Sequence, residues 1–168
     1  MSSSATSEPL TIRPLESEAE AQWCARLMST SEPWVTLGRT YQESLERMRD
    51  ETRERYVARR GSVLAGFLVV NMKGAFVGYI QTVCVTPEQR GKGIGTRLVQ
   101  YAEERIFRES PNVFICASSF NYEARKLYEG LGYMLVGALR DYLVRGHSEL
   151  LLRKSTGPIG EFQKRGGG

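Results

Sequence analysis

The sequence predicts one α+β domain whose sheet is mixed, not uniformly parallel. Strand-like runs cluster in the middle of the chain instead of alternating with helices, which argues against a doubly wound parallel sheet. A single strand-helix-strand crossover follows Val85, and such a crossover connects parallel strands of one sheet. The predicted order is β-α-α-β-β-β-α-β-α-β-β over residues 9–155. At 168 residues, the chain is long enough to build one independent core.

Six elements are expected before a glycine-rich turn. Pro33 ends the first helix region, because the residue before a proline is pushed out of helical geometry. Gly61 and Gly74 mark the turns between three successive strands. The last of these strands is apolar at nearly every position, which is typical of a central strand covered on both faces. The six are a strand at 10–15, helices at 16–29 and 41–51, and strands at 54–59, 63–72 and 76–86.

Five elements are expected after that turn. Leu98, Ala102 and Ile106 fall on one face of the first helix, as a helical period requires. Gly130 and Gly132 bracket the end of the second helix, a common arrangement at helix C-termini. The five are a helix ending near 108, a strand at 112–118, a helix at 121–131, and strands at 133–139 and 148–153.

The composition is that of an ordinary globular protein, with 41% hydrophobic and 25% charged residues. No apolar run approaches the ~20 residues that a membrane-spanning helix needs. The first residues, MSSSATSEPL, are neither basic nor apolar, so they do not resemble a secretory signal. We therefore expect a cytoplasmic protein without membrane contact. Residues 1–8 are expected to be a disordered lead-in, and residues 156–168 a flexible tail.

The cysteines and the single histidine predict neither disulfides nor a metal site. Cys24, Cys84 and Cys116 are odd in number, widely spaced and set among apolar neighbours, as buried free thiols are. His147 alone offers too few ligands for a zinc cluster.

The net charge of +4 and the pI of about 9.1 are compatible with an anionic ligand. Much of the basic charge lies in residues 47–60, where it is interleaved with acids as on a solvated helical face. No repeated combination of aromatic and basic residues indicates an RNA-binding sheet, so no nucleic-acid partner is expected.

The glycine-rich turn between the third strand and the next helix is a candidate anion site. Three glycines at alternate positions let the backbone curl, so that several N–H groups point into one concavity at a helix N-terminus. Such a concavity suits a phosphate or a pyrophosphate, and the basic side chains and the threonine add further contacts. The turn consists of Arg90, Gly91, Lys92, Gly93, Ile94, Gly95 and Thr96.

Two familiar phosphate-binding patterns do not fit this turn. In a P-loop the Gly-Lys pair is followed by serine or threonine, whereas Lys92 is followed by Gly93. In the dinucleotide fingerprint the last two glycines are three apart, whereas Gly93 and Gly95 are two apart.

The turn instead resembles the Q/R-x-x-G-x-G/A loop of the GNAT superfamily of acetyltransferases. A second segment, from Asn121 to Tyr133, is similar to the N-x-x-A-x-x-L-Y-x-x-x-G-F/Y block of the same enzymes. The resemblance implies an acyl-CoA N-acyltransferase fold with a mostly antiparallel sheet and a V-shaped splay. It also implies an N-acetyltransferase that uses acetyl-CoA, without a metal, and passes the acetyl group directly to a primary amine.

The resemblance also implies which residues hold the donor. The backbone of the strand that contains Val83, Cys84 and Val85 would bind the pantetheine arm. Residues 90–96 would hold the pyrophosphate. Asn121 would contact the cofactor as well, and Tyr128 would stand near its sulfur.

Transfer to an amine requires a proton donor for the leaving thiolate and an acceptor for the amine proton. Tyr128 is the candidate acid, seven residues after Asn121 on the same helix face. Many relatives place a glutamate on a central strand, but here Gln81 and Cys116 occupy such positions. The base is therefore open.

The first candidates for the base are Glu32 and Glu149, with Asp141, His147 and a water chain as alternatives. The break between the first two helices is where such enzymes build the acceptor site. There Trp34 and Tyr41 are expected to form an apolar wall, and Glu32 to attract a cationic amine.

A protein N-terminus, a lysine and a small amine all remain open as the acceptor. A homodimer is the default expectation for the oligomeric state. The alternative is a non-catalytic module that binds or senses acyl-CoA.

Overall fold

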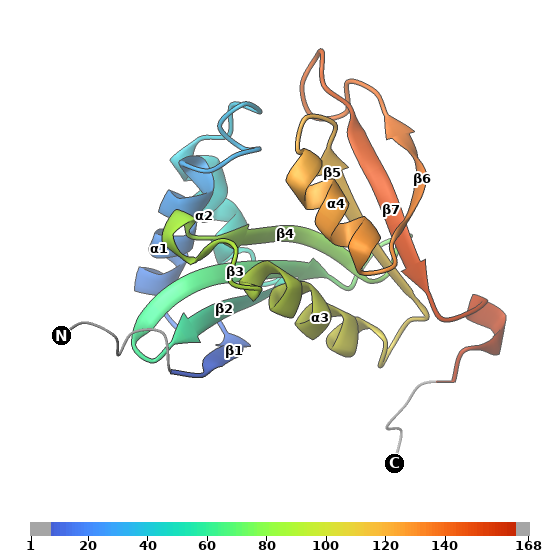
Figure 1. Ribbon diagram of the computed structural model, residues 1–168, viewed down its shortest axis with the longest axis horizontal. Helices are drawn as coiled ribbons and strands as arrows, with labels where there is room; N and C mark the ends of the chain where they lie inside the picture. The colour runs from blue at the N-terminus through green and yellow to red at the C-terminus, as the bar shows by residue number, and fades with distance from the viewer. Residues whose placement is uncertain (1–7, 164–168) are drawn as a thin grey trace.

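The computed structural model describes residues 8–163 as one seven-stranded sheet with four α-helices (Figure 1). The order of the elements and the α+β class are as predicted. The strands are β1 (Leu10–Pro14), β2 (Glu54–Arg60), β3 (Val63–Asn71), β4 (Tyr79–Val85), β5 (Asn112–Ser118), β6 (Met134–Leu139) and β7 (Glu149–Ser155). The helices are α1 (Glu18–Ser29), α2 (Tyr41–Arg49), α3 (Ile94–Ile106) and α4 (Tyr122–Gly130), with 3-10 turns η1 (Pro87–Gln89) and η2 (Ile159–Glu161).

Side-chain caps fix the starts of the first two helices. Ser17 Oγ accepts a hydrogen bond from the backbone N–H of Glu20 at 3.2 Å. At α2, Thr40 Oγ1 accepts from the N–H of Glu43 at 3.1 Å, and the Glu43 carboxylate accepts from the N–H of Thr40 at 2.8 Å. This capping box satisfies backbone groups that a helix leaves free. It also anchors the chain between α1 and α2, which borders the site described below.

The sheet order is β1-β2-β3-β4-β5-β7-β6, and every neighbouring pair is antiparallel except β4 and β5. The parallel ladder between β4 and β5 contains only two residue pairs, Tyr79 with Phe114 and Ile80 with Ile115. Beyond these pairs the two strands separate, which produces the V-shaped opening seen in Figure 1. The expected mixed, mostly antiparallel sheet with a splay is therefore confirmed.

The helices cover both faces of the sheet and divide the core in two. On one face, α1 and α2 pack on β2, β3 and β4 around Met28, Met48 and Phe67. On the other face, α3 and α4 pack on the sheet around Leu68 and Leu98. All five side chains are fully buried. The two cores cover β4 from both sides while its edge toward β5 opens.

The strand expected at residues 76–86 begins later, at Tyr79. The reason lies at Gly78, which has a φ of 89° and whose absent Cβ would lie 2.6 Å from the backbone oxygen of Asn112. The chain passes too close to β5 here for an L-residue in strand geometry. The expectation that this strand is covered on both faces is confirmed: Cys84 packs into the core under α1 and α2, and Ile80 and Val83 pack into the core under α3 and α4, although every second residue is only half-buried. Tyr79, Gln81 and Val83 are the half-exposed residues that face the opening.

The predicted lead-in at 1–8 lies outside the described residues except for Glu8, and residues 164–168 of the predicted tail do as well. Within the rest of that tail, the backbone N–H of Thr156 donates to the oxygen of Pro111 at 2.9 Å, and η2 follows. No helix within residues 8–163 is long and apolar enough to cross a membrane.

Candidate active site

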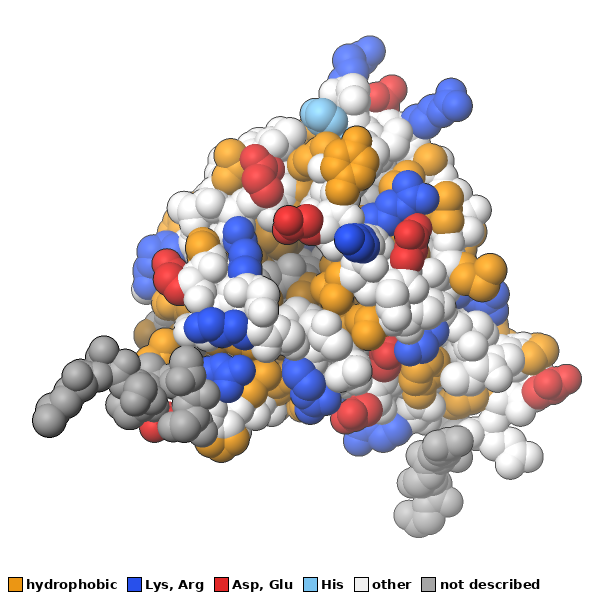
Figure 2. Space-filling model, viewed as in Figure 1, with side chains coloured by type: hydrophobic (Ala, Val, Ile, Leu, Met, Phe, Trp, Pro, Cys, Tyr) orange, Lys and Arg blue, Asp and Glu red, His pale blue; other side chains and the backbone are white. Residues whose placement is uncertain are grey.

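A cavity of about 280 Å³ lies where β4 and β5 separate. Figure 2 shows a hollow between the two sides of this opening, with acidic and basic side chains at its rim. The chain between α1 and α2 forms one wall, and α4 with the connection between β6 and β7 forms another. The cavity therefore collects residues from five helices and strands (α2, β4, β5, α4 and β7) and from two connections that are far apart in the sequence.

Beyond Ile80, the edge of β4 that faces β5 has no strand partner among the described residues. The opposite edge pairs with β3 as far as Val85. Free polar groups on a strand edge can hydrogen-bond an extended ligand that lies alongside them. The resemblance to acetyltransferases implies pantetheine contacts in this same stretch, and Val83 lines the cavity there.

Cys84 can contribute to this edge only through its backbone. Its side chain is 4% exposed and packs with the core beneath α1, on the face away from α3. Burial raises the pKa of the Cys84 thiol to about 12, so the thiol stays protonated at neutral pH. Cys24 is buried and unpaired as well, and Cys116 is a half-buried free thiol.

The glycine-rich turn leads directly from β4 into α3. Gly91 and Gly93 have φ values of 75° and 80°, in the left-handed region that glycine favours. A Cβ at either position would meet no atom within 4 Å, so open space lies over the turn. Gly93 is the N-cap of α3, where helix N–H groups are free to bind an anion. These features fit a pyrophosphate.

The other residues of the turn have distinct environments. Arg90 is exposed, and its Nε donates to the backbone oxygen of Val85 at 3.2 Å. Lys92 is exposed, whereas the Ile94 side chain is buried in the core. Gly95 faces Leu127 of α4, which a Cβ would approach to 3.5 Å. The turn therefore presents backbone groups at its centre and cations around them.

Asn121 and Tyr128 both lie on the α4 side of the cavity. Asn121 is the N-cap of α4, and its Oδ1 accepts from the N–H of Ala124 at 3.3 Å. Tyr128 is 7% exposed, and its ring makes an edge contact with Tyr133 at 6.2 Å between centroids. Burial raises the pKa of the Tyr128 hydroxyl, so it is fully protonated at neutral pH.

Glu149 is the buried carboxylate of the cavity. It is the first residue of β7 and is 6% exposed. Its Oε1 accepts a hydrogen bond of 2.6 Å from the hydroxyl of Ser118, which lies opposite it in the β5–β7 ladder. Burial raises the pKa of the Glu149 carboxyl, and the bond from Ser118 offsets part of that increase. A carboxyl with a raised pKa beside an open cavity has the properties of a general base.

Glu32 also lines the cavity, but in a different setting. It is exposed, and its carboxylate accepts from the backbone N–H and the hydroxyl of Thr36 at 3.2 and 2.9 Å. Of the two aromatic residues expected to form the apolar wall of the acceptor site, Trp34 lines the cavity.

Tyr41 does not line the cavity, because it is exposed at the start of α2. Its assignment to the apolar wall is therefore wrong.

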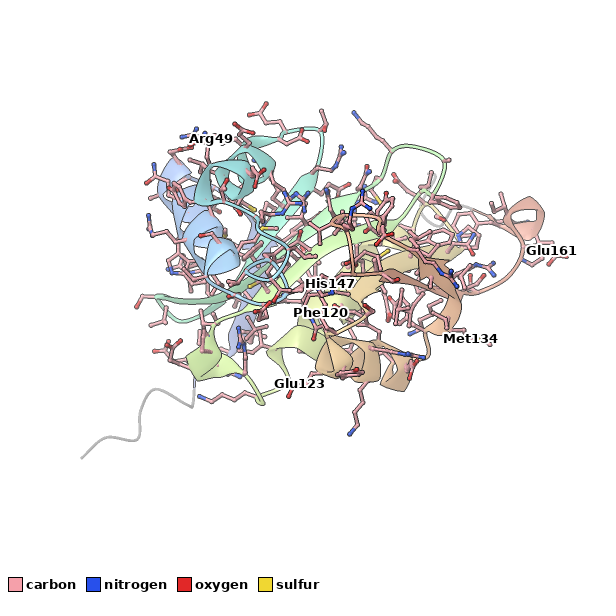
Figure 3. The ribbon with its side chains drawn as sticks, turned by 90° about the horizontal axis from the view of Figure 1, so that it is seen from above. Arg49, Phe120, Glu123, Met134, His147 and Glu161 are labelled. Atoms are coloured by element: carbon pink, nitrogen blue, oxygen red, sulfur yellow. The ribbon has the colours of Figure 1, made fainter. Side chains whose placement is uncertain are left out.

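The other two candidate bases lie outside the cavity lining. Asp141 accepts from the backbone N–H of Gly146 at 2.7 Å and thereby closes the turn between β6 and β7. His147 packs edge-on against Phe120, with 4.9 Å between ring centroids. Figure 3 labels both side chains, which lie next to each other. It precedes β7, so it is not part of the same strand as Glu149.

The two strand positions without a carboxylate do face the cavity. Gln81 accepts a hydrogen bond from Arg53 Nε at 3.1 Å. Cys116 lies beside the hydroxyl of Tyr79, and burial raises the pKa of its thiol. Neither side chain accepts a proton at neutral pH. Among the residues that line the cavity, Glu149 is therefore the buried candidate for the general base.

Several residues of the cavity are not predicted by any sequence pattern. Arg39 and Arg47 line its α2 side, and Tyr142 and Leu143 reach it from the connection between β6 and β7. The expectation of a solvated face is wrong for Arg47, which is half-buried. No sequence pattern distinguishes these residues, because the segments that contain them have the charged and turn-forming composition of an ordinary exposed surface.

The chain belongs to the acetyltransferase (GNAT) family, whose model matches residues 17–133. It is similar to N-alpha-acetyltransferase RimI of Mycobacterium tuberculosis, with 30% identity over 162 residues that cover 91% of this chain and 97% of that protein. This is an N-acetyltransferase family, and acetyl-CoA is the acetyl donor that its members use.

Solved structures share the fold at lower identity. The ribosomal-protein-S18-alanine N-acetyltransferase from Escherichia coli superposes with a TM-score of 0.70 at 16% identity, over 92% of this chain and 99% of that one. An aminoglycoside 6'-N-acetyltransferase complexed with coenzyme A gives a TM-score of 0.70 at 18% identity, over 88% and 98% of the two chains. The expected GNAT fold is confirmed.

Proposed function

We propose that this protein transfers an acetyl group from acetyl-CoA directly to a primary amine, in the cavity between β4 and β5. The observation that carries the proposal is the convergence of Tyr128 and Glu149 on one cavity at the open edge of β4. The Tyr128 hydroxyl is protonated and can donate its proton, whereas the Glu149 carboxylate has a raised pKa and therefore a raised affinity for a proton.

The donor would lie along β4 with its phosphates on the glycine-rich turn. The free edge beyond Ile80 offers backbone groups to the pantetheine, and the open space at Gly91 and Gly93 accommodates the pyrophosphate. Residues 90–96 and Asn121 make up the rest of this proposed donor site. The charge of Arg90 and Lys92 adds to that of the α3 N-terminus.

Acetyl-CoA supplies the thioester: the amine nitrogen bonds to the carbonyl carbon, and the carbon–sulfur bond breaks. Glu149 accepts the proton that the amine must lose, directly or through one water. Tyr128 donates its hydroxyl proton to the departing thiolate. Protons and charges then balance, because Glu149 gains one proton and Tyr128 loses one. Solvent restores both groups after product release.

Cys116 takes no part in this transfer. Its raised pKa keeps it as a thiol, which is a poor nucleophile. Direct transfer therefore predicts that acetyl-CoA alone leaves no acetyl group on the protein. It also predicts that Cys116→Ser retains turnover.

An α-amino group is the favoured acceptor. The supporting relative is named for N-alpha acetylation and aligns over nearly its whole length. An α-amine has a pKa of roughly 7.7–8.0, well below that of lysine at about 10.4, so more of it is neutral at pH 7. A modest base such as Glu149 is then sufficient.

The test is turnover with acetyl-CoA against short peptides with free N-termini, peptides with a single lysine and a blocked N-terminus, and small amines. Release of coenzyme A and the mass of the product are measured. Peptide α-amines should be acetylated fastest. Tight coenzyme A binding without turnover on any acceptor would contradict the proposal and favour the acyl-CoA sensing alternative.

A further inference from the structure

Two arginines form the α2 side of the cavity. Arg39 comes from the end of the segment between α1 and α2, and Arg47 from the last turn of α2. Both are half-buried and line the same cavity as Glu149 and Tyr128. The proposed mechanism uses neither of them.

These two guanidinium groups lack partners within residues 8–163. The Arg39 Nε is buried and forms no hydrogen bond in that range. Arg47 takes part in no ion pair of the described residues, and its charged neighbours are mainly other arginines, Arg39 and Arg53. Burial, together with these cations, lowers the pKa of Arg47 to about 10, so it is still protonated at neutral pH.

The nearby acids are engaged elsewhere. Asp50 accepts from the backbone N–H and the hydroxyl of Thr52 at 2.9 and 2.5 Å, and it lies 3.9 Å from Arg53. Glu32 is bonded to Thr36.

Three further groups complete the surroundings of the arginines. Glu43, an acid near Arg39, accepts from the backbone N–H and the hydroxyl of Thr40 at 2.8 and 3.2 Å. Glu149 is bonded to Ser118. Tyr79, which faces Arg47, is kept neutral because burial raises its pKa. This end of the cavity therefore carries positive charge that the protein itself does not neutralise.

A half-buried cation without a counter-charge destabilises the fold, because it loses hydration and gains nothing in return. Arginine is well suited to binding carboxylates, since its planar fork can donate two parallel hydrogen bonds. A pair of such residues in a cavity therefore indicates an anionic ligand.

The donor's phosphates are not that ligand. The glycine-rich turn lies at the C-terminal end of β4, whereas Arg47 lies by Tyr79 at its N-terminal end. A strand of seven residues spans about 20 Å. The arginines therefore face the acceptor side of the cavity.

Resting on the proposed function, we infer that the acceptor is an amine that also carries a carboxylate, held by Arg39 and Arg47 while its nitrogen reaches the thioester. An N-terminal segment with an acidic residue near the free amine has this chemistry. A polycation is disfavoured, since it would bring further positive charge to this wall.

The test uses amidated tetrapeptides in matched pairs that have glutamate or glutamine at the first, second or third position and alanine elsewhere. The kcat/KM ratio of glutamate to glutamine peptide should be about tenfold or more for at least one pair, the range of charge-assisted hydrogen bonds. Arg47→Gln and Arg39→Gln should each lower that ratio toward one. Arg49→Gln is the control, because Arg49 is on the same helix but pairs with Glu18 on the surface, away from the cavity (Figure 3).

A wild-type ratio near one for every pair would overturn the inference, as would a ratio that survives both cavity substitutions. Failure of the transferase proposal is a separate outcome, in which no peptide is acetylated. In that case the affinity of the protein for the same peptide pairs is measured by calorimetry with coenzyme A present, and this affinity tests the anion site on its own. Tighter binding of a glutamate peptide that depends on Arg47 supports the anion site, and equal binding of both members rejects it.

Discussion

Ser118 and Glu149 face each other across the β5–β7 ladder, and the serine hydroxyl donates to the glutamate carboxylate over 2.6 Å at the wall of the cavity. The serine is 3% exposed and the glutamate 6%, so the bond is sheltered from solvent. It holds the carboxylate in one position and favours its charged form. The predictions below begin with this pair.

Glu149→Gln should lower kcat/KM by about tenfold to a hundredfold. This loss is smaller than the loss expected for a base that bonds the amine directly, because a water molecule can relay the proton. In the wild type, activity should fall as the pH drops through the raised pKa of Glu149, because the carboxylate is the active form. With a peptide acceptor measured from pH 5 to pH 8, the variant should lose the part of this decline that Glu149 causes and keep only the part that protonation of the acceptor amine causes. A variant with the full rate and an unchanged profile would exclude Glu149 as the base.

Ser118→Ala provides a second measurement of the same group. The hydroxyl lowers the pKa of Glu149, so its removal should raise that pKa further. The acidic limb should then move to higher pH, while the plateau rate changes little. A limb that stays in place would show that another group titrates there.

Glu32→Gln should have a small effect on rate. The carboxylate is exposed and bonded to Thr36, so it mainly orders the segment between α1 and α2. We expect a change in kcat/KM of less than about threefold and an unchanged acidic limb, since exposed polar groups contribute little. A loss equal to that of Glu149→Gln would instead assign the base to Glu32.

Tyr128→Phe should lower kcat by roughly 10²–10⁴-fold when chemistry limits the rate, the range for loss of a general acid. Acetyl-CoA affinity should be retained, because the ring and its packing remain. Tyr133→Phe is the matched control: it is also buried, contacts Tyr128, and its hydroxyl bonds Glu103 at 3.4 Å, away from the cavity lining. Equal kcat losses in both variants would indicate a packing effect.

Gly93→Val should weaken coenzyme A binding while the protein still folds. A side chain would fill the open space over the turn and strain a backbone with a φ of 80°. Gly74→Val separates these effects, because Gly74 has a φ of 93° and equally open surroundings in the loop before β4. Both variants should lose about 1 kcal/mol or more of stability, but only Gly93→Val should lose affinity in calorimetry.

Arg47→Gln should stabilise the fold at neutral pH. The pKa of Arg47 is lowered on folding, so its charged form costs free energy at every pH below about 10. Removal of the charge should add about 1 kcal/mol to the free energy of unfolding, after allowance for the solvent that reaches the group. Arg49→Gln, which removes only an exposed pair with Glu18, should lower it slightly or leave it unchanged. A lower Tm for Arg47→Gln would show that Arg47 has a structural role.

The sequence was sufficient for the order of elements, because hydrophobic periodicity and the two glycine-containing segments are local signals. It also identified Tyr128, Glu149 and the glycine-rich turn as candidates, and the fold brings Tyr128 and Glu149 into one cavity. The start of β4 is not predictable in this way, because the close approach of Gly78 to Asn112 depends on a neighbour 34 positions away. For the same reason, Arg39 and Arg47 were not recognised: only the tertiary structure determines which surface arginines face a cavity.

The short pairing of β4 with β5 gives this protein two edge strands in the interior of its sheet. Unpaired edges are templates for strand addition by another chain and promote aggregation. Here the gap between them is a place for an extended, amide-bearing molecule, and the donor's pantetheine arm is one. Coenzyme A should therefore slow aggregation during storage and protect the backbone amides of Val83 and Val85 from hydrogen exchange. Bound in this way, the ligand would complete the sheet that the polypeptide leaves open.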